Sequence, residues 1–111
     1  MHTNAITDIA EDLVTVGQAL SHQARVRILG ILAEGERCGC ELAEIIGLDP
    51  SVVSRHLSLL SAAGLIVSRR EGPRLLWRLA HPEIPAILRC LARLTCERGE
   101  NDVVADHLER I

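Results

Sequence analysis

The chain has 111 residues, of which 48% are hydrophobic, and a formal net charge of −3. A single domain over residues 1–111 is expected, and because a lone domain of this size has a modest core, a dimer that buries more surface is plausible. With one Trp and no Phe or Tyr, the core must be aliphatic, which favours helices with a small hairpin. No apolar run could span a membrane and the acidic N-terminus is unlike a signal peptide, so we expect a cytoplasmic protein.

Two amphipathic helices are predicted first. Apolar residues at helical spacing mark a helix over about residues 6–20, namely Ile6, Ile9, Leu13, Val16 and Leu20. Ser21 is placed to cap a second helix, from His22 to Ala33, with Ile28, Leu29 and Leu32 facing inward. Arg25 and Arg27 lie between these apolar positions and are expected on the outer side.

A helix, a short turn and a second helix follow over about residues 41–63. Gly47 ends the first helix, since glycine takes left-handed angles at little cost. Asp49 is a typical N-cap, with Pro50 at the first helical position. One polar face of the second helix holds small hydroxyls and one arginine, at Ser51, Ser54, Arg55 and Ser58. Such a face can lie in a DNA major groove, the alternative being a solvated surface.

Residues 65–79 are predicted to form a β-hairpin, because two apolar runs flank Glu71-Gly72-Pro73. Leu75, Trp77 and Leu79 alternate with Arg74, Leu76 and Arg78, the period of a half-buried strand. Arginines cluster near the tip, at Arg69, Arg70 and Arg74. A hairpin behind a helix-turn-helix is the winged-helix arrangement, so the fold class is mainly α with a small β-hairpin. The basic tip would reach phosphates or the adjacent minor groove.

Charge is distributed unevenly along the chain. Residues 51–78 hold five arginines against the single acid Glu71, a balance of +4, so the remainder of the chain sums to −7. A local basic patch governs DNA affinity, so a net charge of −3 does not exclude DNA binding.

The last helix, over about residues 83–96, carries a continuous apolar stripe that requires a partner. Its members are Ile84, Ile87, Leu88, Leu91 and Leu94. This stripe is therefore expected to lie in an interface.

Cys38-Gly39-Cys40 is the motif of the sequence that most strongly indicates a chemical function. Residues i and i+2 of a regular helix point about 200° apart, but Gly39, just ahead of the predicted helix, allows the bend that chelation needs. The helix N-terminus and Arg37 favour thiolates, which bind soft ions. The alternative is a pair of small cysteines with no role.

The chain resembles the ArsR family of metal- and metalloid-sensing bacterial repressors over about residues 19–85. The similar runs are ALSHQARVRILGIL, ERCGCELAEIIGL, SVVSRHLSLLSAAGLIVSRREG and WRLAHPEIP. The resemblance implies a homodimeric winged helix-turn-helix repressor that holds double-stranded operator DNA and releases it when a toxic ion binds cysteines. It also implies a dimer interface made by the last helix, about residues 83–96, and the first one, about residues 6–20. It places arsenic or cadmium/lead ligands at Cys38 and Cys40, whereas Ala43 stands where some arsenic sensors have a third cysteine.

The resemblance leaves several residues with alternative roles. His56 matches the SRHL motif and is structural or contacts DNA, and Arg25 matches a commonly basic position that supports the fold or contacts a phosphate. Cys96, on the polar side of the last helix, is the better third ligand, while Cys90 is expected to be buried and structural. Zinc-sensing relatives carry Asp/His ligands along the last helix, and here only Asp102, Asp106 and His107 resemble them.

A repressor released by arsenite is the leading interpretation. Cd(II), Pb(II) or Zn(II) as the inducer and a thiol-redox switch remain alternatives, although Cys38 and Cys40 are too close for an easy disulfide. We expect no enzyme, because no catalytic base accompanies the two thiols and no CxxC motif exists. A dimerisation module without DNA binding is disfavoured by the arginine-rich hairpin.

Overall fold

The computed structural model describes residues 5–101, and the side chains of residues 5–96. Its elements are α1 (Ala5–Asp8), α2 (Ala10–Ala19), α3 (Gln23–Leu32), β1 (Arg37–Cys38), α4 (Gly39–Ile46), α5 (Pro50–Ala62), β2 (Ile66–Glu71), β3 (Arg74–Leu79) and α6 (Ile84–Asn101). The prediction of a mainly helical winged helix-turn-helix is confirmed.

The N-terminal helix is divided, where the sequence predicted one helix over residues 6–20. Ile9 leaves helical geometry, with φ −113° and ψ 19°, and separates α1 from α2. Ile6 and Ile9 are 62% and 41% exposed, so little packing within this chain holds the segment straight.

The cap of α3 also differs from the prediction. Nδ1 of His22 accepts the N–H of Ala24 at 3.1 Å, while the Ser21 hydroxyl donates to the carbonyl of Gln18.

The turn between α4 and α5 follows the sequence signals closely. Gly47 takes φ 81° and its N–H bonds to the carbonyl of Ala43 at 2.8 Å. Asp49 accepts the N–H of Ser51 at 2.8 Å and Pro50 opens α5. One aliphatic core joins these helices to α3 and β2, and its largest fully buried members are Ile28, Leu29, Leu42, Val53, Leu60 and Ile66.

The sheet has three antiparallel strands in the order β1-β3-β2, and the two-residue strand β1 was not predicted. Gly72 takes φ 62° in the tight turn, as expected of the hairpin. The burial of β3 departs from the prediction: Leu76 is 6% exposed, flanked in register by Cys38 and Arg69, whereas Leu75 is 36% exposed. Leu75 lines an open cavity together with Trp77, so that face of the strand is not closed.

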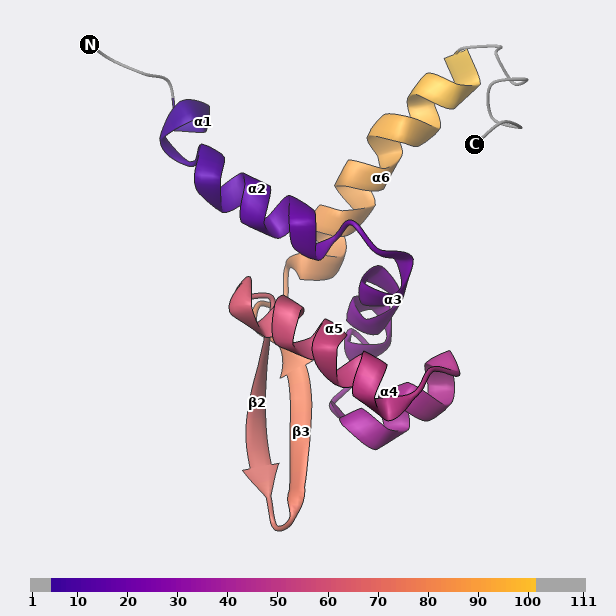
Figure 1. Ribbon diagram of the computed structural model, residues 1–111. Helices are drawn as coiled ribbons and strands as arrows, with labels where there is room; N and C mark the ends of the chain where they lie inside the picture. Colours follow the sequence, from indigo (N-terminus) through magenta and orange to yellow (C-terminus); the bar gives the residue numbers. More distant parts are fainter. Residues whose placement is uncertain (1–4, 102–111) are drawn as a thin grey trace.

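Different elements extend from the two ends of the molecule (Figure 1). The β2–β3 hairpin, called the wing below, projects from the end that holds α4 and α5, whereas α2 and α6 extend from the other end. Between residues 5 and 101, no helix has both the length and the apolar character that crossing a membrane requires.

Candidate nucleic-acid interface and thiol site

The polar face of α5 is exposed as the sequence predicted. Ser51, Ser54, Arg55 and Ser58 are all exposed. The Ser51 hydroxyl donates to the Asp49 carboxylate at 2.7 Å and so also serves the helix cap. Arg55 makes no hydrogen bond or ion pair with any other described residue, which leaves its guanidinium available to a ligand.

His56 and Arg25 are both buried. Arg25 is 9% exposed, against the expectation of an outer position, and its Nη1 donates to Nδ1 of His56 at 3.1 Å. Its Nε donates to the carbonyl of Ala19 at 2.8 Å. Burial lowers the pKa of His56, and the charges of His22, Arg25 and Arg55 lower it further. Because arginine can only donate, His56 accepts through Nδ1 and carries its proton on Nε2. The burial of His56 and its bond with Arg25 favour the structural role of this histidine over a DNA contact.

Two of the three wing-tip arginines are paired with glutamates that precede the helix-turn-helix or lie within it. Arg69 donates two hydrogen bonds to Glu36, at 2.8 and 2.7 Å, and lowers the pKa of that carboxyl. The Nη2 of Arg74 lies 3.4 Å from Oε1 of Glu41. Arg70 has no partner among the described residues. The basic patch is thus weaker than the charge count over residues 51–78 indicates, because Glu36 and Glu41 lie outside that range.

Cys38 and Cys40 lie at the start of α4, which begins two residues earlier than predicted. Cys38 is the N-cap, with φ −86° and ψ 164°, and Cys40 is in the first turn. Gly39 is the first helical residue and does not have a positive φ. Both cysteines line one cavity of about 410 Å³, together with Ser54 and Leu57 of α5 and with Arg74, Leu75 and Trp77 of β3. The fold therefore brings the two thiols, α5 and the wing to one place.

The cation beside the thiols is Arg74, which the sequence indicated only as a DNA contact. Cys38, followed by the charge of Glu41, raises the pKa of Arg74. Oε1 of Glu41 accepts the N–H of Cys38 at 2.9 Å, the arrangement of a capping box in which cysteine replaces serine. This bond is also the main reason for the lowered pKa of Glu41. The predicted neighbour Arg37 instead donates to the carbonyl of Glu36 and approaches Glu34.

The other two cysteines do not join the thiol pair within one chain. Cys90 and Cys96 are exposed on α6, so the prediction that Cys90 is buried is wrong; Nη2 of Arg93 lies 3.9 Å from the Cys90 sulfur. Neither lines the cavity of the thiol pair, and α6 runs away from α4 (Figure 1). Within the described part of the chain, no three His, Cys, Asp or Glu side chains are grouped to hold a metal ion. Asp102, Asp106 and His107 lie outside the described residues.

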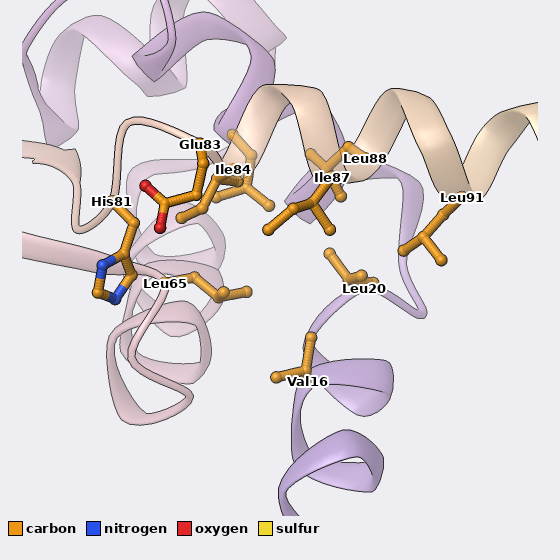
Figure 2. A pocket seen from close by; sticks show the side chains of 10 residues that line it. Val16, Leu20, Leu65, His81, Glu83, Ile84, Ile87, Leu88 and Leu91 are labelled. Carbon is orange, nitrogen blue, oxygen red and sulfur yellow. The ribbon is translucent and has the colours of Figure 1, made fainter. Parts of the chain in front are cut away.

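A second cavity, of about 250 Å³, lies between α2 and the start of α6. Figure 2 shows Val16 of α2 and Leu20, the residue that follows α2, directed toward Ile87 and Leu88, with His81 at one end. Apart from His81 and Glu83, its lining is aliphatic, and it continues into the exposed apolar face of α6. It therefore belongs to the unpartnered surface at this end of the molecule.

Comparison with known proteins agrees with this architecture. Residues 22–68 match the family model described as "Bacterial regulatory protein, arsR family". The uncharacterized HTH-type transcriptional regulator Rv0081 of Mycobacterium tuberculosis is 37% identical over 89 residues, covering 79% of this chain and 77% of that protein. The arsenic resistance transcriptional regulator ArsR1 of Pseudomonas putida is 41% identical over 71 residues, covering 63% and 55%. The homodimeric winged helix-turn-helix domain of Mb0332 from Mycobacterium bovis has a TM-score of 0.73 at 29% identity, covering 99% of this chain and 94% of that one.

These relatives are transcriptional regulators rather than enzymes, as the sequence predicted. The family match spans the thiol pair, the helix-turn-helix and the first residues of the wing. This chain therefore belongs to the arsR family of bacterial regulatory proteins.

Proposed function

We propose that this chain is a cytoplasmic, homodimeric repressor that releases double-stranded operator DNA when arsenite binds the thiolates of Cys38 and Cys40. The observation that carries the proposal is the cavity shared by both thiols, α5 and the wing. An ion held in this cavity would contact the DNA-binding unit directly.

The DNA contacts would come from two places. The exposed Ser54 and Arg55 on α5 offer a hydroxyl and a guanidinium to base edges in a major groove. Arg70, unpaired among the described side chains, offers a charge to a phosphate beside that groove. Replacing Ser54 or Arg55 by Ala should cost about 1–3 kcal/mol and relax sequence preference.

The dimer would form through α2 and α6. Apolar side chains on these helices are 48–67% exposed, among them Leu13, Val14, Ile87, Leu91 and Leu94. Apolar surface of this kind marks an interaction site. A second copy is the partner that we propose, because the similar Mb0332 domain is homodimeric. A twofold dimer would present its two α5 helices to two half-sites of an operator.

Two thiols suit a soft ion, and arsenite in particular. Cys38 has extended backbone angles and lies outside the regular helix, so the two thiols are not fixed about 200° apart. Together they can displace two hydroxyl groups from As(OH)₃, with release of two molecules of water. A third sulfur, if one is used, would come from the partner subunit, since the described residues of one chain do not supply it.

Trp77 allows the site itself to be tested. It is the single tryptophan of the chain and it lines the cavity of Cys38 and Cys40. Arsenite should change its emission and, over the same concentrations, release a labelled duplex selected from a random library. Cys38→Ser and Cys40→Ser should bind the duplex normally and show neither response, and serine at position 38 preserves the capping box with Glu41.

Cys90→Ser is the matched control, because this cysteine is exposed on α6 and should leave both responses intact. If a Cys38/Cys40 double variant is released at wild-type arsenite concentrations, the sensing site lies elsewhere. Parallel titrations with Cd(II), Pb(II), Zn(II) and peroxide identify the inducer, and release by peroxide alone would favour the redox alternative.

A further inference from the structure

Glu36, which directly precedes β1, holds one of the wing arginines. Its carboxylate accepts two hydrogen bonds from Arg69 of β2, from Nε to Oε2 at 2.8 Å and from Nη2 to Oε1 at 2.7 Å. An arginine uses the same two-armed geometry to bind a phosphate. In the free protein, Glu36 therefore occupies the donors with which Arg69 would contact DNA.

Two neighbouring charges lie farther from this pair. Nε of Arg78 is 4.0 Å from Oε2 of Glu36, beyond hydrogen-bond distance. Oε2 of Glu71 is 4.0 Å from Nη2 of Arg69, and the Glu71 side chain is 58% exposed, against 26% for Glu36. Glu36 is thus the partner that determines whether the charge of Arg69 is available to a ligand.

The paired arginine and the unpaired one lie on opposite faces of the wing. In the register of β2 with β3, Arg69 is opposite Leu76 and Arg70 is opposite Leu75. Successive side chains of a strand point to opposite faces. Arg70 has no hydrogen bond or ion pair with another described residue. One face of the wing therefore presents a free guanidinium, and the other presents a guanidinium that a carboxylate neutralises.

We propose that Glu36 limits the affinity of the wing for DNA by keeping Arg69 away from phosphates. A groove of the duplex has a phosphate strand on each side, so a wing that enters it meets phosphates on both faces. With Arg69 held by Glu36, only the face of Arg70 attracts them strongly. Phosphate contacts carry no sequence information, so this restraint makes binding depend more on α5. The inference rests on the DNA binding of the proposed function and does not depend on the inducer.

A phosphate gains little by displacing Glu36 from Arg69. It would have to compete with a carboxylate that is held in the same chain. The displaced carboxylate would then lie close to the phosphate, and the two negative charges would repel each other. Removal of the carboxylate charge, rather than exchange, is therefore what should free Arg69.

Glu36→Gln tests the proposal on DNA of any sequence. Glutamine keeps the size of the side chain but not its charge. Affinity for a labelled random-sequence duplex is measured by fluorescence anisotropy at several salt concentrations. For each chain that contacts the duplex, the slope of log affinity against log salt should steepen by about 0.9, equal to one further phosphate contact. If the two proteins bind alike near about 1 M salt, this slope corresponds to about eightfold tighter binding at about 0.1 M.

Glu34→Gln is the matched control for the loss of one negative charge. The Glu34 carboxylate lies 3.9 Å from Arg37 rather than on the wing, and its side chain is 76% exposed. The salt slope of this variant should change by less than about 0.3, because an exposed charge away from the contact is screened. The double variant of Glu36→Gln and Arg69→Gln has the wild-type net charge and should bind within about twofold of the wild type, since it loses a pair that contributes no phosphate contact. Thermal melts establish that each variant is folded.

Three outcomes would overturn the role of Glu36. A folded Glu36→Gln protein that binds no more tightly than the wild type would mean that Glu36 only positions the wing. A double variant that binds much more weakly than the wild type would mean that Arg69 contacts phosphates despite Glu36. An equal gain in Glu34→Gln would mean a general effect of net charge.

These outcomes are separate from failure of the proposed inducer. If arsenite does not release the wild-type protein but Glu36→Gln gains affinity as expected, the inducer is wrong and the role of Glu36 stands. If arsenite releases the wild type and Glu36→Gln gains no affinity, the inducer stands and the role of Glu36 falls. If neither protein binds the random or the selected duplex, both proposals fail.

Discussion

Replacing Arg25 by Ala should destabilise the protein strongly, because this buried guanidinium joins three segments of the chain. It donates to the carbonyl of Ala19 at 2.8 Å, to Nδ1 of His56 at 3.1 Å and to the carbonyl of Gln18 at 3.1 Å. The first and third acceptors end α2, and the second lies on α5. The variant leaves these acceptors without their charged donor.

The size of the effect follows from the burial of two of these bonds, those to Ala19 and His56. A hydrogen bond to a charged group contributes about 1.5–3 kcal/mol, so two of them contribute about 3–6 kcal/mol. Water entering the space left by the side chain lowers this cost, and we expect a loss of about 3 kcal/mol. A domain of this size loses about 4–8 °C of Tm for each kcal/mol, so the Tm should fall by about 12 °C or more.

Thermal melts followed by circular dichroism measure the difference. All samples are compared at one protein concentration, because the Tm of a dimer depends on concentration. Arg27→Ala is the control, since Arg27 is exposed on the same helix and its loss should be worth less than about 0.5 kcal/mol. If Arg25→Ala melts within about 2 °C of Arg27→Ala, the buried bonds do not stabilise the fold as argued.

Three further results are expected. The folded pKa of His56 is lowered below its ordinary value of 6.5, so the unfolded chain takes up the proton first. Stability is then full above pH 6.5 and declines as the pH falls toward the lower folded value, and His56→Gln should flatten this decline in urea titrations. Arg70→Ala should lower the salt slope of DNA binding by about 1 for any sequence, and Arg69→Ala by less, because Glu36 already neutralises Arg69. Leu91→Glu should sediment as a monomer, whereas Ile45→Glu, equally exposed but on α4, should remain a dimer.

Elements with strong local signals were predictable from the sequence. Gly47, Asp49 and Pro50 each act on their own stretch of backbone, so the turn and the start of α5 could be placed to within a residue. The hairpin turn at Gly72 was predictable for the same reason. Strand β1 was not, because two residues carry no periodicity and their strand conformation comes from pairing with β3.

Positions that depend on contacts distant in sequence could not be predicted. Helical spacing predicted that Arg25 would lie on the outer side of its helix. Instead, the carbonyls of Gln18 and Ala19 at the end of α2 accept hydrogen bonds from the Arg25 guanidinium. The alternation in β3 predicted an inward Leu75, but that face borders the cavity of the thiol pair. The pairing of Arg74 with Glu41 joins residues 33 positions apart, and no local pattern indicates it.

A signal from the two thiols to α5 and the wing would have to travel only a short distance. Ser54 on the exposed polar face of α5 and Arg74 on the wing both line the cavity that holds Cys38 and Cys40. An inducer there would alter the DNA-binding surfaces by direct contact, and no relay through the core or through α6 is needed. A ligand shifts such an equilibrium only by its preference for the released state, and a hundredfold preference corresponds to about 2.8 kcal/mol. Induction would therefore require no rearrangement of the aliphatic core, in which Leu42 and Leu60 are fully buried.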